Sequence, residues 1–136
     1  MENEQVPGDN YCFACGKENP IGLHLNFKIE DDKFVAEKEL SRKYQSFTGI
    51  VHGGIVTTLL DEAMGGYLVA LGKKGVTARI SVRYRKPTPV GETLKIIGWQ
   101  DSSRGRFIDM KAKIVLPDGS VSAEGEARMA LVEEND

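Results

Sequence analysis

The chain has 136 residues, the size of one domain, and its 18 basic and 20 acidic residues give a net charge of −2. A charge this close to zero provides no overall field to attract nucleic acid or an anionic membrane, so neither is expected as a partner. The N-terminus has no signal-peptide pattern and no run of eighteen apolar residues occurs, so we expect one cytoplasmic domain over 1–136, with 1–10 as a flexible tail.

The first distinctive pattern is YCFACGKENPIGLHL, which contains Cys12 and Cys15, the only two cysteines of the chain. A structural zinc site needs about four ligands, and the two histidines, His24 and His52, stand at spacings that no common zinc finger uses. A redox pair takes its reactivity from a helix N-terminus, whereas a turn and a strand are predicted here. We therefore expect no metal site, and two thiols that pack as small apolar groups.

Alternating apolar and polar residues predict a hairpin over 23–40, and residues 41–52 are expected to form a loop. Apolar residues then recur at helical spacing over 53–72, which predicts one helix of about five turns. Four more alternating segments follow, namely Val76–Arg85, Glu92–Gln100, Arg106–Leu116 and Ser120–Val132. Because the helix alone is available to cover the apolar sheet face, we expect an α+β fold in which one curled antiparallel sheet wraps around a single long central helix.

The predicted helix carries two acidic residues, Asp61 and Glu62, and no basic residue before Lys73. Glycines and threonines take the place of the charged pairs of a solvated face, so both sides of the helix are expected to be covered. A carboxylate kept there without a cation costs free energy of desolvation, which makes Asp61 a functional candidate. The alternative is that the carboxylate caps a loop or meets a sheet arginine such as Arg79 or Arg83, and we favour this alternative for Glu62.

The helix is preceded by VHGG, which places two glycines at its start. They are expected to leave unpaired N–H groups at the positive end of the helix dipole, where a carbonyl oxygen could become an oxyanion; a hinge or a glycine cap is the alternative. Gly53 and Asp61 are about 12 Å apart along the axis, too far to act on one carbonyl. Two antiparallel copies of the helix would bring Gly53 of one subunit near Asp61 of the other, so we predict a two-fold dimer with two shared sites.

The stretch GIVHGGIVTTLLDEAMGG resembles the helix signature of the hotdog-fold acyl-CoA thioesterases of the phenylacetic-acid-pathway type, and VTARISVRYRKPTPVGETLKI is similar to the strand that follows it in that family. The resemblance implies a sheet around a central helix, a dimer that often pairs into a tetramer, and hydrolysis of acyl-CoA without metal or cofactor. An acyl dehydratase or hydratase of the same fold is one alternative, and a module that binds acyl-CoA without chemistry is another.

Carried over by position, the resemblance makes Asp61 the nucleophile or the general base, while the Gly53 N–H polarises the thioester carbonyl. Gly54 would contact the substrate beside it, and His52 would help to position the carbonyl. Thr77 would orient the water or the carboxylate. Because a thiolate is a good leaving group, a carboxylate and an N–H donor suffice without a catalytic triad.

Two further groups of residues complete the predicted site. Some relatives use an asparagine before HGG, and here Gln45 or Ser46 stands in its place. Phe13, beside the cysteines, is expected to border the acyl pocket.

Basic residues follow the helix, where alternation places Arg79, Arg83 and Arg85 on one face of the strand 76–85 and the even-numbered residues on the other. With Lys86 at the strand end, they would suit the phosphates of CoA, and we prefer Arg85 or Lys86 to Arg79. Pairing with acidic residues of neighbouring strands explains any one of them equally well.

Overall fold

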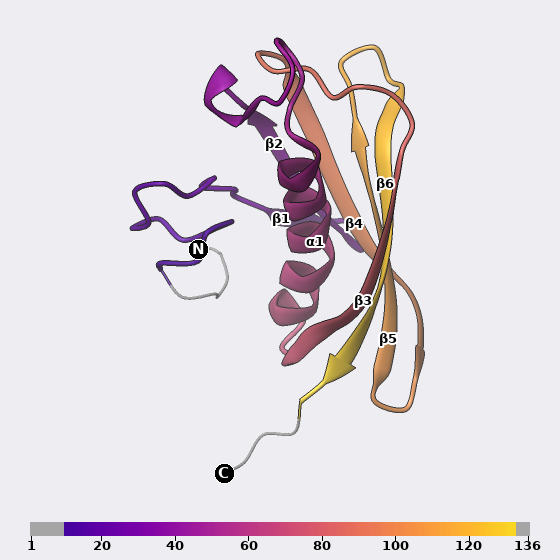
Figure 1. The fold of residues 1–136 in the computed structure, drawn as a ribbon. Helices are drawn as coiled ribbons and strands as arrows, with labels where there is room; N and C mark the ends of the chain where they lie inside the picture. The colour runs from indigo at the N-terminus through magenta and orange to yellow at the C-terminus, as the bar shows by residue number, and fades with distance from the viewer. Residues whose placement is uncertain (1–9, 133–136) are drawn as a thin grey trace.

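The computed structural model describes residues 10–132, which form one sheet and one long helix (Figure 1). The tail predicted for 1–10 lies outside these residues except for Asn10. In chain order the elements are β1 (Lys28–Glu30), β2 (Lys33–Glu39), the 3₁₀ turn η1 (Arg42–Tyr44), α1 (Gly53–Ala70), β3 (Gly75–Tyr84), β4 (Thr93–Arg104), β5 (Phe107–Val115) and β6 (Val121–Leu131). No helix in this part of the chain is long and apolar enough to cross a membrane.

The six strands form one sheet in the order β1-β2-β4-β5-β6-β3, and each neighbouring pair is antiparallel. Figure 1 shows α1 lying along one face of this twisted sheet. The predicted α+β fold, with one curled antiparallel sheet and a single long helix, is therefore confirmed.

The helix packs very closely on β4, because glycine stands beneath it. The buried side of α1 consists of Val56, Leu59, Leu60, Ala63, Met64, Tyr67 and Leu68. A Cβ atom built on Gly98 of β4 would lie 2.2 Å from the carbonyl oxygen of Ala63, which no real Cβ contact approaches. On β6, a Cβ atom at Gly125 would meet the flexible methyl group of Met64 at 3.2 Å. Glycine at position 98 thus sets the distance between the helix backbone and the sheet.

The N-terminal part of the predicted hairpin is not a strand, and β1 has only three residues. Leu23 and Leu25 are buried as expected, but their N–H groups donate to the carbonyl oxygens of Phe13 and Ala14 at 2.8 and 2.9 Å. The loop that contains the two cysteines is therefore tied to residues 23–25. Figure 1 shows this segment on the side of α1 that faces away from β5 and β6.

The strand β3 forms one edge of the sheet and is ten residues long, whereas β1, at the other edge, has three. Val76 and Tyr84 of β3 expose 57% and 54% of their surface. Within residues 10–132 the outer edge of β3 pairs with no other strand. A long edge strand of this kind offers its backbone to a second chain.

Candidate active site

Asp61 lies in the third turn of α1, on the partly exposed strip of the helix that its buried side leaves free. The hydroxyl group of Thr77, on β3, donates a hydrogen bond of 3.0 Å to Asp61 Oδ1. The structure thus brings together two of the predicted site residues, which come from the helix and from the edge strand.

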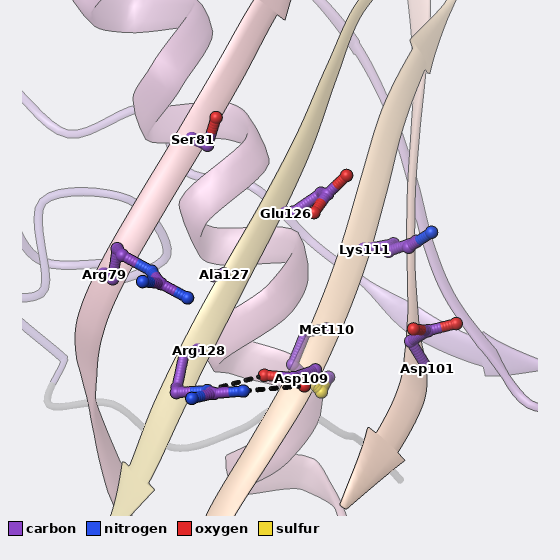
Figure 2. Close-up of a pocket in the computed structure, with 9 residues that line it drawn as sticks. All are labelled: Arg79, Ser81, Asp101, Asp109, Met110, Lys111, Glu126, Ala127 and Arg128. Carbon is purple, nitrogen blue, oxygen red and sulfur yellow. Dashed lines mark hydrogen bonds and ion pairs between the residues drawn. The ribbon is translucent and has the colours of Figure 1, made fainter.

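A β-bulge in β3 turns Thr77 toward the helix. Thr77 pairs with Met129 of β6 and Arg79 pairs with Arg128, so the register shifts by one residue at Ala78. Met129 is buried beneath the helix, whereas Arg79 and Arg128 lie on the outer face of the sheet (Figure 2). In a regular strand Thr77 and Arg79 would share one face, and the bulge separates them.

The bulge also corrects the predicted face of the first residue of this strand. Simple alternation placed Val76 on the apolar inner face with residues 80, 82 and 84. In the structure Val76 pairs with Ala130 on the outer side and is exposed. The bulge leaves no mark in the apolar pattern, since residues 76–80, VTARI, alternate apolar and polar as in a regular strand.

At the start of α1, the backbone N–H group of Gly54 is capped by a side chain, whereas that of Gly53 has no acceptor among the described residues. His52 is the N-cap residue, and its Nδ1 accepts a hydrogen bond of 2.9 Å from the N–H of Gly54. The N–H groups of Ile55 and Val56 reach the His52 carbonyl. Among the described residues no acceptor meets the N–H of Gly53. The prediction of two unpaired N–H groups therefore holds only at Gly53, and the observed contact of the His52 ring is with the helix.

Tyr84, which the sequence did not single out, fixes the first turn of the helix. Its hydroxyl donates to the Gly53 carbonyl at 3.0 Å and shares a 2.6 Å hydrogen bond with Thr57 Oγ1. This contact holds the Gly53 peptide against the end of β3. The only signal in the sequence was a tyrosine at an inward position at a strand end.

A cleft of about 430 Å³ with a mostly apolar lining opens at this end of the helix. It is lined by Ser46, Phe47, Ile50, Val51, Gly53, Val56, Tyr84, Arg85, Lys86, Pro87 and Thr88. Four of the predicted site residues, Ser46, Gly53, Arg85 and Lys86, thus meet around one cavity. Gln45 and Phe13 are not among its lining residues, and the Gln45 side chain accepts a hydrogen bond from the N–H of Gly49 at 3.0 Å.

The predicted phosphate-binding cations have different surroundings. The Arg85 guanidinium is paired with Glu124, as the structural alternative anticipated. Arg83 borders a small outer hollow together with Glu124 and Glu126. The Lys86 ammonium donates to Ser120 Oγ at 3.0 Å and, within residues 10–132, forms no ion pair. Lys86 is therefore the cation beside the cleft whose charge is least neutralised.

Glu62 follows Asp61 on the helix, but its carboxylate lies beside the two cysteines of the N-terminal loop. One ligand atom each of Cys12, Cys15 and Glu62 lie within 4.8 Å of one another. Burial raises the pKa of the Cys15 thiol, and the nearby Glu62 charge raises it further. Burial likewise raises the pKa of Glu62, against a hydrogen bond from Cys15 that lowers it. Of the two alternatives expected for Glu62, the ion pair with a sheet arginine is absent among residues 10–132, and the carboxylate contacts a loop, through the Cys15 thiol.

A second hollow, of about 330 Å³, lies on the outer face of the sheet and is drawn in Figure 2. Its lining consists of Arg79, Ser81, Asp101, Asp109, Met110, Lys111, Glu126, Ala127 and Arg128. Asp109 accepts hydrogen bonds of 2.9 and 3.2 Å from Arg128, which hold the pKa of Asp109 below its usual range. Acids and bases are mixed here, and Asp61, Thr77 and Gly53 lie elsewhere, so we place the candidate site at the helix.

Comparison with known proteins agrees with this architecture. Residues 48–123, more than half of the chain, match the family model of the thioesterase superfamily. Acyl-coenzyme A thioesterase THEM4 of Bos taurus is 26% identical over 104 residues, which cover 75% of this chain and 43% of that protein. The chain spans less than half the length of the curated relatives that it matches.

The solved structures include a thioesterase superfamily protein that superimposes with a TM-score of 0.84 at 32% identity, over 89% of this chain and 60% of the other. A hypothetical thioesterase from Streptococcus pneumoniae TIGR4, solved with coenzyme A, gives 0.75 at 23% identity, over 82% of this chain and 88% of the other. Two further structures of that protein carry alanine in place of an aspartate and of a threonine sixteen residues apart.

The Escherichia coli PaaI protein from the phenylacetic acid degradation operon shares the fold, with a TM-score of 0.73 at 16% identity over 79% of this chain and 83% of its own. The resemblance to hotdog-fold thioesterases that the helix signature indicated is therefore confirmed in the sequence match and in the architecture. The chain belongs to the thioesterase superfamily.

Proposed function

We propose that the protein hydrolyses acyl-CoA thioesters to a free acid and CoA. The observation that carries this proposal is the Asp61 carboxylate, held by the Thr77 hydroxyl on a helix whose first N–H, at Gly53, has no acceptor among residues 10–132. A bovine relative is named an acyl-coenzyme A thioesterase and a streptococcal neighbour was solved with coenzyme A, which supports the choice of substrate.

The chemistry needs one group that supplies an oxygen nucleophile and one that accepts charge. Asp61 either removes a proton from the attacking water or attacks the thioester carbonyl itself, and in the second case water then releases the acid. As the carbon becomes tetrahedral, its oxygen gains negative charge, which the Gly53 N–H stabilises at the positive end of the helix dipole. The C–S bond then breaks, CoA leaves as a thiolate and takes up a proton.

The two groups would act together across a dimer. Gly53 and Asp61 lie eight residues apart on one helix, about 12 Å along its axis, so one subunit does not offer both to one carbonyl. The long exposed edge of β3 supports pairing with β3 of a second subunit. The partly exposed strip of α1 would then contact the same strip of α1 in that subunit. We propose a homodimer with two shared sites, which pairs further into a tetramer.

The spacing of the proposed pair gives a further reason for its role. Asp61 and Thr77 stand sixteen residues apart, as do the aspartate and the threonine that were replaced by alanine in the streptococcal structures. In this proposal Thr77 orients the Asp61 carboxylate. Lys86, at the mouth of the apolar cleft, would hold a phosphate group of CoA.

The direct test is to incubate the purified protein with short, medium, long and aromatic acyl-CoA substrates and to detect free CoA with a thiol reagent. We expect release of CoA from at least one class. Binding of acyl-CoA without release of CoA from any of them would favour the alternative of a non-catalytic acyl-CoA-binding module.

Replacing Thr77 tests how the carboxylate is held. We expect Thr77→Ala to lower kcat about tenfold, because a hydrogen bond to a charged group contributes about 1.5–3 kcal/mol and alanine has no hydroxyl. Thr77→Ser keeps the hydroxyl and should retain most of the activity. Equal activities of the alanine and serine variants in a steady-state assay would contradict the role of this hydrogen bond.

A shared site makes a sharper prediction, which uses Gly53→Pro. Proline removes the N–H donor yet suits the first position of a helix, and His52 already has the extended backbone (φ −56°, ψ 137°) that precedes proline. We expect the homodimers of Gly53→Pro and of Asp61→Asn each to lose about 10²-fold or more in kcat. After free subunit exchange, an equal mixture of the two variants should recover about a quarter of wild-type activity, because half of all dimers are mixed and each mixed dimer has one intact site out of two.

The control for this experiment is Gly53→Ala, which keeps the N–H and whose Cβ would meet Tyr84 only at ordinary distance, 3.7 Å or more. Light scattering should report a mass at least twice the 15.0 kDa of one chain. If the mixture of the two inactive variants regains no activity although mixed dimers form, both groups act from one subunit and the shared site is excluded.

A further inference from the structure

We propose that Cys12, Cys15 and Glu62 bind one divalent transition-metal ion that prefers thiolate ligands, with Zn²⁺ as the expected occupant. One ligand atom of each residue lies within 4.8 Å of the others, and this is the one such group among the described residues. The ion would join the N-terminal loop to the central helix, outside the reaction that we propose for Asp61.

The loop holds its two sulfur atoms in a defined turn. The N–H of Gly16 donates to the carbonyl of Cys12 at 2.8 Å, and a Cβ atom at position 16 would lie 2.4 Å from the Cys12 nitrogen and 2.3 Å from the Asn10 carbonyl oxygen. Only glycine allows the chain to close here, so the C-x-x-C-G pattern has a structural reason. The hydrogen bonds from Leu23 and Leu25 keep this turn in place.

Among the residues that the structure describes, Glu62 has no cation of the kind that a partly buried carboxylate normally requires. Within residues 10–132 it forms no ion pair, and its hydrogen-bond partner is the Cys15 thiol. A Cβ atom at Gly66 would lie 3.1 Å from Glu62 Oε2 and 3.0 Å from the Phe34 ring, so the carboxylate and the ring both lie close to the helix at Gly66. Because a thiol is a weak donor, it offsets little of the desolvation cost, whereas a divalent ion would satisfy all three groups.

The donor set identifies the class of ion. Two thiolates and one carboxylate suit a borderline-soft ion such as Zn²⁺ and do not suit Mg²⁺ or Ca²⁺. With metal bonds of about 2.0–2.3 Å, tetrahedral geometry needs ligand atoms about 3.3–3.8 Å apart, a small contraction from the observed cluster. A water molecule would take the fourth position.

The histidines that the sequence offered as further ligands are both occupied elsewhere. His24 Nε2 forms a 2.8 Å hydrogen bond with the carbonyl of Asn19, and His52 caps α1. The third ligand comes instead from the helix, 47 residues after Cys15 in the chain. This is why the spacing rules for zinc fingers did not indicate the site.

The test uses the reduced full-length chain, freed of metal and of any affinity tag. We titrate it with Co²⁺ and record absorption, since thiolate ligands give charge-transfer bands in the near ultraviolet and tetrahedral Co²⁺ gives ligand-field bands in the visible. We expect saturation at one equivalent, loss of the bands when Zn²⁺ is added, and a rise of about 5 °C in Tm with Zn²⁺.

Variants then assign the ligands. Cys12→Ser, Cys15→Ser and Glu62→Gln should each abolish the bands at one equivalent and the rise in Tm, while Asp61→Asn, the neighbouring carboxylate on the helix, should leave both unchanged. Failure of the reduced wild-type chain to bind one equivalent would overturn the proposal, whatever the variants do. Bands of full strength in Glu62→Gln would overturn the three-ligand site.

Discussion

Asp61→Asn is expected to lower kcat for acyl-CoA hydrolysis by about 10²–10⁴-fold, the range in which a positioned general base contributes. The amide of asparagine neither removes a proton from water nor attacks the thioester carbonyl. Its carbonyl oxygen still accepts the hydrogen bond that Thr77 now donates to Asp61 Oδ1, so the helix and β3 should keep their arrangement. Release of CoA under saturating substrate, with binding of the substrate measured separately, gives the effect on kcat alone.

The matched control for this prediction is Asp101→Asn. Asp101 is an exposed aspartate beside the outer hollow of the sheet (Figure 2), and its replacement should leave kcat within about twofold of the wild type. Undiminished hydrolysis by Asp61→Asn would remove Asp61 from the mechanism. The fold assignment would stand, since it depends on the sheet and the helix.

The largest effect on stability is expected for Gly98→Ala, which should lower the free energy of unfolding by about 3 kcal/mol. The new Cβ atom would lie 2.2 Å from the carbonyl oxygen of Ala63 and 2.7 Å from its carbonyl carbon, so the helix backbone itself must move away from β4. Urea denaturation at one fixed protein concentration measures the change, because the stability of an oligomer depends on concentration.

Gly125→Ala is the matched control, since it makes the same chemical change in β6 beneath the same helix. Its Cβ atom would meet Met64 Cε at 3.2 Å and Leu60 Cβ at 3.4 Å, and the methionine side chain is able to move. We expect a loss below about 1 kcal/mol. Equal effects at the two positions would show that the helix moves freely on the sheet, in contradiction to the close contact at Ala63.

The elements that the sequence predicts well are those with a clear period. The helix was expected over 53–72 and extends over Gly53–Ala70, because its apolar side repeats every three or four residues against the sheet. The strand expected to begin at Leu23 does not form there. Leu23 and Leu25 are buried, but they pair with the loop at residues 13–14 and not with a neighbouring strand. An alternating pattern predicts that alternate side chains are buried, but it does not predict which segment of the chain covers them.

The candidate site was partly visible in the sequence for the same reason. Asp61 stood out as one of two acids on a helix without a basic residue, and Gly53 as the donor at its start. The contacts made by Tyr84 and Glu62 join segments that lie 27 or more residues apart, so local patterns do not predict them. The capping of Gly54 by His52 is local, but it depends on a side-chain conformation that spacing leaves open.

The bulge at Ala78 makes the local pairing of β3, as well as its composition, part of the site. Residues before Ala78 follow one phase of alternation and residues after it follow the other. If the same residues paired regularly, Ala78 would lie opposite Met129 and Thr77 would turn to the outer face, away from Asp61, although no residue had changed. Substitutions that straighten this strand would therefore act on catalysis directly, and a threonine aligned without a gap in a relative faces the helix only where the bulge is also present.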